Sequence, residues 1–243
     1  MRVLVTGATG LIGSACLARL HREGHELVAA GRAIGEAARR QPFARWIAAD
    51  FSRLTEPDDW MPLIAGIDAV VNCVGVLEQS IRDDIVGTQV GGTIALFDAC
   101  ARAGIRRVVH ISAIGASAEG RTDFARTKAL ADAHLAGLNL EWTILRPALV
   151  MAPAVYGGTA MLRALAAFPS FVPGISAAKQ IQVASIDDLT ETVALCLRAE
   201  TPARVIWEVA GVAMRLVGGA TGRVAEASGL RGLSPAPLTA EIR

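Results

Sequence analysis

Short β-branched runs alternate with longer helical stretches through residues 1–146, and this alternation sets the fold class of the chain. Six runs have the pattern of strands: RVLVT, HELVAA, ARWIAA, DAVVNCV, RRVVHIS and EWTILR. Several of them are apolar on both faces, so helices must cover them from both sides, as in a parallel sheet. The segments between them have the length of crossover helices: residues 10–23, 83–103 and 122–138. Glycines that end such segments are the expected C-caps: Gly24, Gly104 and Gly137. The sequence therefore predicts a doubly wound α/β sheet.

The regular spacing loosens after Pro147, where further prolines and glycines indicate loops and short helices. A helix follows in SIDDLTETVALCLRAE, with Ser185 or Asp187 near its start, and a late strand in ARVIWEVAG. Three regions result: a core over residues 1–146, a small substrate-side lobe over 147–211 interleaved with the last strand and helix, and a tail over 212–243. We expect this tail to be loosely packed or partly disordered.

Composition and charge narrow the function classes. Apolar residues make up 52% of the 243 residues, charged residues 19% and aromatic residues 5%, which is typical of a well-buried fold. The formal net charge is +1 and no basic stripe with interleaved aromatics occurs, which argues against a nucleic-acid partner. We find neither a signal-peptide pattern nor an apolar run of about 18 residues, so we expect a cytoplasmic protein without a transmembrane segment.

The cysteines are widely spaced and form no CxxC pair: Cys16, Cys73, Cys100 and Cys196. Such spacing favours buried free thiols over a zinc site or a redox pair. We therefore expect no metal.

The run VTGATGLIG places three glycines, Gly7, Gly10 and Gly13, where the first strand turns into the first helix. Glycine permits a tight turn and close approach to a pyrophosphate, and a helix N-terminus offers unpaired N–H groups to it. The spacing is GxxGxxG rather than GxGxxG, but its place in a βαβ unit supports dinucleotide binding in a Rossmann fold. The expected cradle also includes the residues between these glycines: Thr9, Leu11 and Ile12.

The second strand ends at Arg32, where an acid would bind the ribose 2′-hydroxyl of NAD(H). A guanidinium suits a 2′-phosphate, so NADP(H) is favoured and NAD(H) stays possible. An exposed surface arginine is the alternative. Asp50 ends the third strand and, with Phe51, is a candidate contact for the adenine, although acids in such places also cap turns.

These features together resemble the short-chain dehydrogenase/reductase superfamily, in its extended and atypical branches. The resemblance is carried by TGATGLIG, NCVG, VVHISA, a residue-xxx-Lys pair and LRP, over residues 1–211. Within it the likeness is nearest to NmrA-like proteins and to the NDUFA9-type subunit of respiratory complex I. It implies a cofactor pocket completed by residues after later strands: Asn72, Val74, Gly75 and Pro147.

In that superfamily a tyrosine, a lysine four residues later, a serine and often an asparagine act together. The resemblance places the serine at Ser112 and the lysine at Lys128, which is implied to bind the nicotinamide ribose. The tyrosine position holds Phe124 and the asparagine position Gln89. A phenyl ring has no proton to give, and general acid catalysis contributes about 10² to 10⁴-fold, so turnover should be slow at best.

Alternatives remain for each of these residues. Ser112 or Tyr156 could replace the missing acid, Phe124 could be a core aromatic, and Lys128 could be an ordinary solvated lysine. His110 is expected to be a packed strand residue rather than a base.

Three functional hypotheses follow. The first is an NADP(H)-binding protein without efficient turnover, acting in redox sensing, regulation or assembly, as the resemblance implies. The second is an NAD(P)-dependent oxidoreductase or epimerase acting on a small carbonyl, a quinone or a nucleotide-linked sugar. The third is an interaction protein at a membrane complex, with the cofactor as a structural element. The small-molecule or protein partner is not specified by the sequence.

Overall fold

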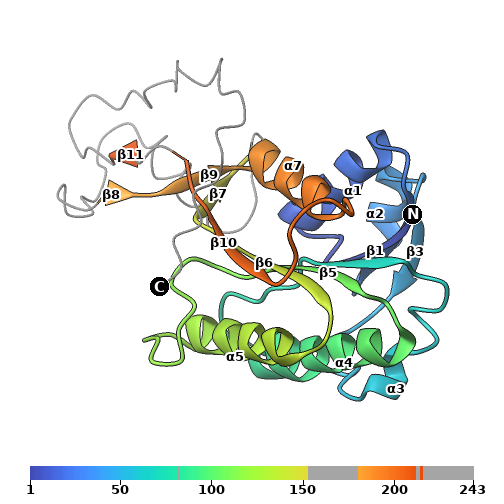
Figure 1. Cartoon of the computed structure of the whole chain (residues 1–243), viewed down its shortest axis with the longest axis horizontal. Coiled ribbons are helices and arrows are strands. Elements are labelled where there is room, and N and C mark those ends of the chain that lie inside the picture. The colour runs from blue at the N-terminus through green and yellow to red at the C-terminus, as the bar shows by residue number, and fades with distance from the viewer. Residues whose placement is uncertain (81–82, 153–179, 212–213, 216–243) are drawn as a thin grey trace. The chain divides into compact units, whose positions relative to one another are not determined.

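The computed structural model describes residues 1–80, 83–152, 180–211 and 214–215 (Figure 1). Its centre is a parallel sheet of seven strands in the described residues, in the order β10-β6-β5-β4-β1-β2-β3. The strands are β1 (Arg2–Thr6), β2 (Glu26–Gly31), β3 (Arg45–Ala48), β4 (Ala69–Asn72), β5 (Arg107–Ile111), β6 (Glu141–Pro147) and β10 (Val205–Val209). The chain builds outward from β1 to β3, then returns to place β4 on the other side of β1. The predicted doubly wound α/β sheet is confirmed.

Helices cover both faces of this sheet (Figure 1). The helices are α1 (Leu11–Arg22), α2 (Gly35–Arg40), α3 (Pro57–Trp60), α4 (Thr93–Ala103), α5 (Asp123–Gly137) and α7 (Ile186–Cys196). A π-helical turn, η1 (Gly87–Gly92), leads directly into α4. One core cluster joins the sheet to α3, α4 and α5, and a second joins its other face to α1 and α7. Burial on both faces explains why central strands such as β4 and β5 are mostly apolar, whereas the edge strands β3 and β10 are only partly buried.

Three details differ from the sequence-based expectation. Gly137 is the last residue of α5 and not its C-cap, because the chain leaves the helix at Leu138 in an extended conformation. Gly104 does cap α4 in the left-handed region, with φ 73°. The segment expected to be one helix over 83–103 begins as a π-turn, and the short helices α2 and α3 were not predicted.

Small strand pairs complete the described structure. β7 (Leu149–Met151) pairs in parallel with β9 (Val183–Ser185), and β8 (Gln180–Ile181) pairs antiparallel with β11 (Met214–Arg215). Contacts divide the chain into one unit of residues 1–152 and 183–211 and a second of residues 153–182 and 212–243. Most of the predicted lobe loops and almost all of the predicted tail lie outside the described residues. Among the described helices, none is long and apolar enough to cross a membrane.

Candidate functional site

The glycine turn between β1 and α1 has no room for side chains. Gly7 adopts φ 62°, and a Cβ added to it would lie 2.7 Å from the carbonyl oxygen of Cys73. A Cβ on Gly13 would lie 2.3 Å from the carbonyl oxygen of Gly7. The Gly10 N–H donates to that same Gly7 oxygen at 2.9 Å and closes the turn. Strand, turn and helix therefore meet by backbone contact, which requires glycine at positions 7 and 13.

The N-terminus of α1 differs chemically from those of α5 and α7. Thr122 and Ser185 cap α5 and α7 with their side chains, and both helices carry acids in the first turn. Helix α1 begins at Gly10 without a side-chain cap and without an acid in its first turn. The first-turn N–H groups of Leu11, Ile12 and Gly13 have no carbonyl one turn earlier to bind. This end of α1 suits a pyrophosphate, as the sequence predicted.

The predicted adenosine end lies after β2 and β3. Arg32 forms an ion pair of 2.6 Å with Asp83, and its side chain is 55% exposed. The Oδ1 atom of Asp50 accepts hydrogen bonds from Ser52 N at 3.2 Å and Ser52 Oγ at 2.8 Å, so this acid caps a turn. Phe51 is 4% exposed and packs edge-on against Trp60, which leaves its backbone for any cofactor contact. Thr9 is exposed and lies close to Gly31.

Lys128 ties together the ends of two strands. Its side chain is 3% exposed, so it is not a solvated surface lysine. The Nζ atom donates to the carbonyl oxygens of Val74 at 2.9 Å and Ile111 at 2.8 Å. Burial lowers the pKa of Lys128 to about 8, against the opposing effect of the nearby Asp132 and Cys73. The ammonium is thus held at the carboxyl edge of the sheet.

Gln89 supplies an unused acceptor beside this ammonium. It is 1% exposed, and its Nε2 donates to Thr127 Oγ1 at 2.9 Å. Its Oε1 has no hydrogen-bond partner among the described residues. A Cβ added to Gly75 would lie 3.6 Å from Lys128 Nζ and 3.7 Å from Gln89 Oε1, so the two groups converge there. An ammonium has three donors and Lys128 uses two on carbonyls. A sugar hydroxyl, which donates and accepts, suits such a pair, so these residues fit a dinucleotide.

The hydroxyl proton of Ser112 points away from the place where Lys128 and Gln89 converge. Its Oγ donates to Asp132 Oδ2 at 2.9 Å, and Arg146 donates to the same oxygen from Nε at 3.0 Å and Nη2 at 2.9 Å. Burial raises the pKa of Asp132, while the hydrogen bonds from Arg146 and Ser112 act in the opposite sense. Ser112 is 4% exposed and therefore belongs to a buried polar network.

The same network fixes the protonation of His110. Asn72 Oδ1 accepts from Thr6 Oγ1 at 2.6 Å and from Val74 N at 3.2 Å, so the amide nitrogen of Asn72 must face His110 Nδ1, 3.1 Å away. Nδ1 accepts, and the ring proton sits on Nε2, 3.5 Å from Asp132 Oδ1. Burial and the charge of Lys128 lower the pKa of His110 well below its ordinary value. His110 is a neutral, packed strand residue, in agreement with the sequence analysis.

The remaining predicted site residues are placed as follows. Phe124 lies half-buried in the first turn of α5, one helical turn before Lys128, and neither core cluster of the described chain includes it. Pro147 ends β6, is buried, and accepts a hydrogen bond from Ile114 N at 3.0 Å. Tyr156 lies outside the described residues.

Three residues near the candidate site were not predicted from the sequence: Asp132, Arg146 and Asp83. A signal existed for Asp132, which lies four residues after Lys128 and therefore one helical turn away on the same side of α5. Arg146 lies in the LRP motif, which indicated a family resemblance but no contact partner. Asp83 gave no such signal, because it meets Arg32 from a separate loop.

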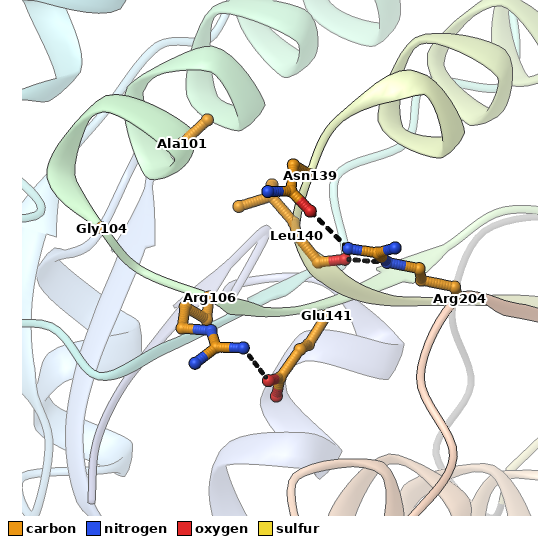
Figure 2. Close-up of a pocket in the computed structure, with 7 residues that line it drawn as sticks. All are labelled: Ala101, Gly104, Arg106, Asn139, Leu140, Glu141 and Arg204. Carbon is orange, nitrogen blue, oxygen red and sulfur yellow. Dashed lines mark hydrogen bonds and ion pairs between the residues drawn. The ribbon is translucent and has the colours of Figure 1, made fainter.

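A polar pocket of about 260 Å³ lies at the opposite, amino-terminal edge of the sheet (Figure 2). Its polar groups bind one another: Arg106 pairs with Glu141 at 2.8 Å, and Arg204 donates to the side-chain oxygen of Asn139 and the carbonyl oxygen of Leu140. It contains none of the predicted site residues. Within the described residues, no cluster of three or more His, Cys, Asp or Glu side chains is placed to hold a metal ion.

Comparison with known proteins agrees with the geometry of the glycine turn. The profile of a family described as NAD(P)H-binding matches residues 7–191, more than half of the chain. The photosystem II assembly factor Ycf39 of Synechocystis is 29% identical over 148 residues, which are 60% of this chain and 44% of that protein. Sterol demethylase protein B of Methylococcus capsulatus is 28% identical over 202 residues, covering 72% of this chain and 60% of that protein. The chain thus spans about half the length of these relatives.

Solved structures share the fold. A putative NAD-dependent epimerase/dehydratase from Bacillus halodurans superposes with a TM-score of 0.67 at 22% identity, covering 88% of this chain and 96% of that one. At this level of identity the likeness shows a common fold. It matches the parallel sheet described above.

Proposed function

The chain belongs to this NAD(P)H-binding family, and we propose that it holds NADP(H) at the glycine turn without efficient turnover, as a redox-sensing, regulatory or assembly protein. One observation carries the proposal: a buried, correctly held lysine, Lys128, is preceded one helical turn earlier by Phe124, which has no proton to donate. Ser112 is a poor substitute acid, because its hydroxyl proton is donated to Asp132. A dinucleotide, when bound, would supply or accept hydride.

Assembly is supported by the likeness to Ycf39, whose name describes it as a photosystem II assembly factor. We also propose, from the sequence resemblance, that the chain is related to NmrA-like proteins and to the NDUFA9-type subunit of complex I. A partner that binds the cofactor-loaded form would use the pocket as a sensor without needing catalysis.

A second candidate function is an NAD(P)-dependent reductase or epimerase. The pKa of Lys128, lowered to about 8 by burial, favours it, because an acid that titrates near neutral pH can deliver a proton itself. The reductase hypothesis also draws on relatives such as the dihydroflavonol 4-reductase of maize, 27% identical over 234 residues. Here Lys128 would be the proton donor and Phe124 part of the substrate wall.

The first experiment combines cofactor binding with a turnover assay on a panel of carbonyl substrates. We expect the wild-type protein to bind NADPH and to reduce nothing measurably. Phe124→Tyr restores a phenol near the ammonium, and its rate should exceed that of the wild type by about 10² to 10⁴-fold. Phe124→Leu, which also lacks a hydroxyl, is the matched control. Wild-type turnover that Lys128→Met abolishes without loss of NADPH binding would instead establish the reductase.

Cofactor preference is tested by titrating NADPH and NADH against the wild type and Arg32→Asp. A guanidinium bound to a 2′-phosphate contributes about 1.5–3 kcal/mol, so we expect the variant to lose about 10 to 100-fold in NADPH affinity and to prefer NADH. Arg102→Asp is the control, because this arginine is similarly exposed and paired but lies on α4. An unchanged preference in Arg32→Asp would mean that this arginine is only a surface residue.

A further inference from the structure

Two cysteines meet at the point where the strand order reverses between β1 and β4. Cys73 follows β4 directly, and its N–H donates to the carbonyl oxygen of Thr6 at 3.2 Å. The close backbone contacts already described place Gly13 of α1 on Gly7, and Gly7 on Cys73. Cys16 lies three residues after Gly13 on the same buried face of α1. This stacking brings Cys16 to Cys73 across the glycine turn.

The surroundings of the two thiols are unequal. Cys16 is fully buried, whereas Cys73 is only partly buried and packs against the core cluster that contains Cys16. The hydrogen bond to Cys73 and burial raise the pKa of Cys16 well above its ordinary value. Cys73 directly precedes Val74, whose carbonyl oxygen accepts from Lys128 Nζ at 2.9 Å, and reactive cysteines are typically found beside such cations. Cys73 is therefore the thiol that a solute can reach. Cys16 is the buried thiol that can attack Cys73 once Cys73 is oxidised.

We propose that Cys16 and Cys73 form a reversible disulfide when the protein meets hydrogen peroxide, and that this bond weakens dinucleotide binding at the glycine turn. The sequence spacing had argued against a redox pair, but the fold joins residues that lie far apart in the chain. The second half of this inference rests on the proposed function, whereas the first half does not.

The chemistry balances with peroxide as the oxidant. The Cys73 sulfur attacks one peroxide oxygen, the O–O bond breaks, and one water leaves, which gives a sulfenic acid on Cys73. The Cys16 sulfur then attacks the Cys73 sulfur, the S–O bond breaks, and the hydroxyl leaves with the Cys16 proton as a second water. Two electrons pass from the sulfurs to one peroxide. A dithiol such as dithiothreitol reverses the bond by exchange.

The bond reaches the cofactor turn through the backbone. A disulfide fixes its two sulfurs about 2.05 Å apart and its two Cβ atoms about 3.8 Å apart, so it would tie α1 covalently to the end of β4. Gly7 lies between them with its Cα facing Cys73 and with no free space. Movement of residues 73 and 74 also disturbs the Val74 carbonyl that holds Lys128. Both changes act on groups that fit the dinucleotide.

Trypsin separates the four cysteines, which makes the bond easy to assign. Cleavage at lysine and arginine places them in different peptides: residues 3–19, 54–82, 83–102 and 180–198. The reduced full-length protein is treated with peroxide at about one equivalent, alkylated, digested and analysed by mass spectrometry. We expect peptide 3–19 linked to peptide 54–82, and loss of this species on addition of dithiothreitol. A link between other peptides, or oxidation without any link, would overturn the proposal.

Affinity for NADPH is then measured before and after peroxide in four proteins. The wild type and Cys100→Ser should bind at least about tenfold more weakly after oxidation, and Cys16→Ser and Cys73→Ser should not change in this way. Cys100 is the matched control because it is equally buried but lies in the core cluster on the other face of the sheet. A linked protein with unchanged NADPH affinity refutes the coupling. A reduced protein that binds no NADPH refutes the proposed function and leaves the cross-link result standing.

Discussion

At the scale of single residues, a neighbouring side chain changes what Arg32 of the candidate cofactor site can bind. Its guanidinium pairs with Asp83 at 2.6 Å, so a phosphate that approaches Arg32 must compete with a carboxylate. Asp83 is held for this contact by Ser80, whose Oγ accepts from Asp83 N at 3.1 Å. We therefore expect the preference between NADPH and NADH to depend on both residues.

Asp83→Asn is expected to increase NADPH affinity and to leave NADH affinity nearly unchanged. A partly exposed ion pair contributes up to about 1 kcal/mol, so removing the competing charge should tighten NADPH binding by about two- to fivefold. Fluorescence titration of both cofactors measures the change. Asp58→Asn, which removes an exposed partner of Arg102, serves as the control. Weaker NADH binding in Asp83→Asn would show instead that this acid binds the ribose.

The sequence was sufficient to place Lys128 and Phe124 one helical turn apart, because helical spacing is local. It was not sufficient to find the partners of Ser112. Asp132 reaches Ser112 from α5 and Arg146 reaches Asp132 from β6, and both contacts depend on tertiary packing. The role of Phe124 stays a prediction, which the Phe124→Tyr variant tests.

At the scale of elements, the π-turn η1 sets the position of Gln89. A Cβ added to Gly92 would lie 2.1 Å from the carbonyl oxygen of Phe51, so η1 and the loop after β3 touch through their backbones. Thr93 Oγ1 donates to the Thr88 oxygen at 2.9 Å within the widened turn. π-turns are rare and often lie at functional sites, and here the turn carries the unpaired acceptor of Gln89.

Gly92→Ala should destabilise the protein, and Gly137→Ala should not. The alanine methyl at position 92 cannot fit beside a backbone oxygen, and overpacking of this kind costs about 1–3 kcal/mol or more. Gly137 is also helical, but an added Cβ meets nothing within 4 Å, so alanine there should add about 0.4–1 kcal/mol. Urea unfolding of both variants measures the difference. Equal stability of the two would mean that η1 can move away from Phe51.

The regular elements were the easiest to predict. Strands such as β1 and β6 carry a continuous apolar pattern, and their bounds agree with the sequence to within a residue or two. The π-turn could not be predicted, because no side-chain periodicity distinguishes it from an α-helix, and it depends on the contact between Gly92 and Phe51.

For the molecule as a whole, burial of ionisable groups makes folding depend on pH. Lys128 has a pKa of about 8 in the folded protein, against 10.5 for an ordinary lysine. Between these values the folded lysine has lost its proton and the unfolded one keeps it. Unfolding therefore takes up a proton at Lys128, so the contribution of this residue to the free energy of unfolding rises with pH across this window.

We expect Lys128 to add up to about 1.4 kcal/mol per pH unit to the slope between about pH 8 and 10. The thiols of Cys16, Cys100 and Cys196, whose pKa values are raised in the folded protein, act in the opposite sense and equally in wild type and variants. The free energy of unfolding of Lys128→Met, which has no titrating group at this position, should therefore fall more steeply with pH than that of the wild type. Lys128→Arg, which keeps its charge throughout the window, is the second variant in case the methionine variant does not fold. Urea unfolding across the range measures the profile, and parallel curves for wild type and variants would contradict the buried ammonium. Asp132, Cys73 and His110 face Lys128 and remain unchanged in all three proteins.

The position of β1 in the sheet also has a consequence for biosynthesis. Its residues pair with β2 on one side and with β4 on the other, in a register that joins Thr6 to Asn72. A ribosome adds about 5–20 residues per second, so the edge of β1 that awaits β4 stays open for roughly 3 to 13 seconds. During that interval the apolar strand β1 has an unpaired edge, so the nascent chain is most exposed to aggregation and most in need of a chaperone.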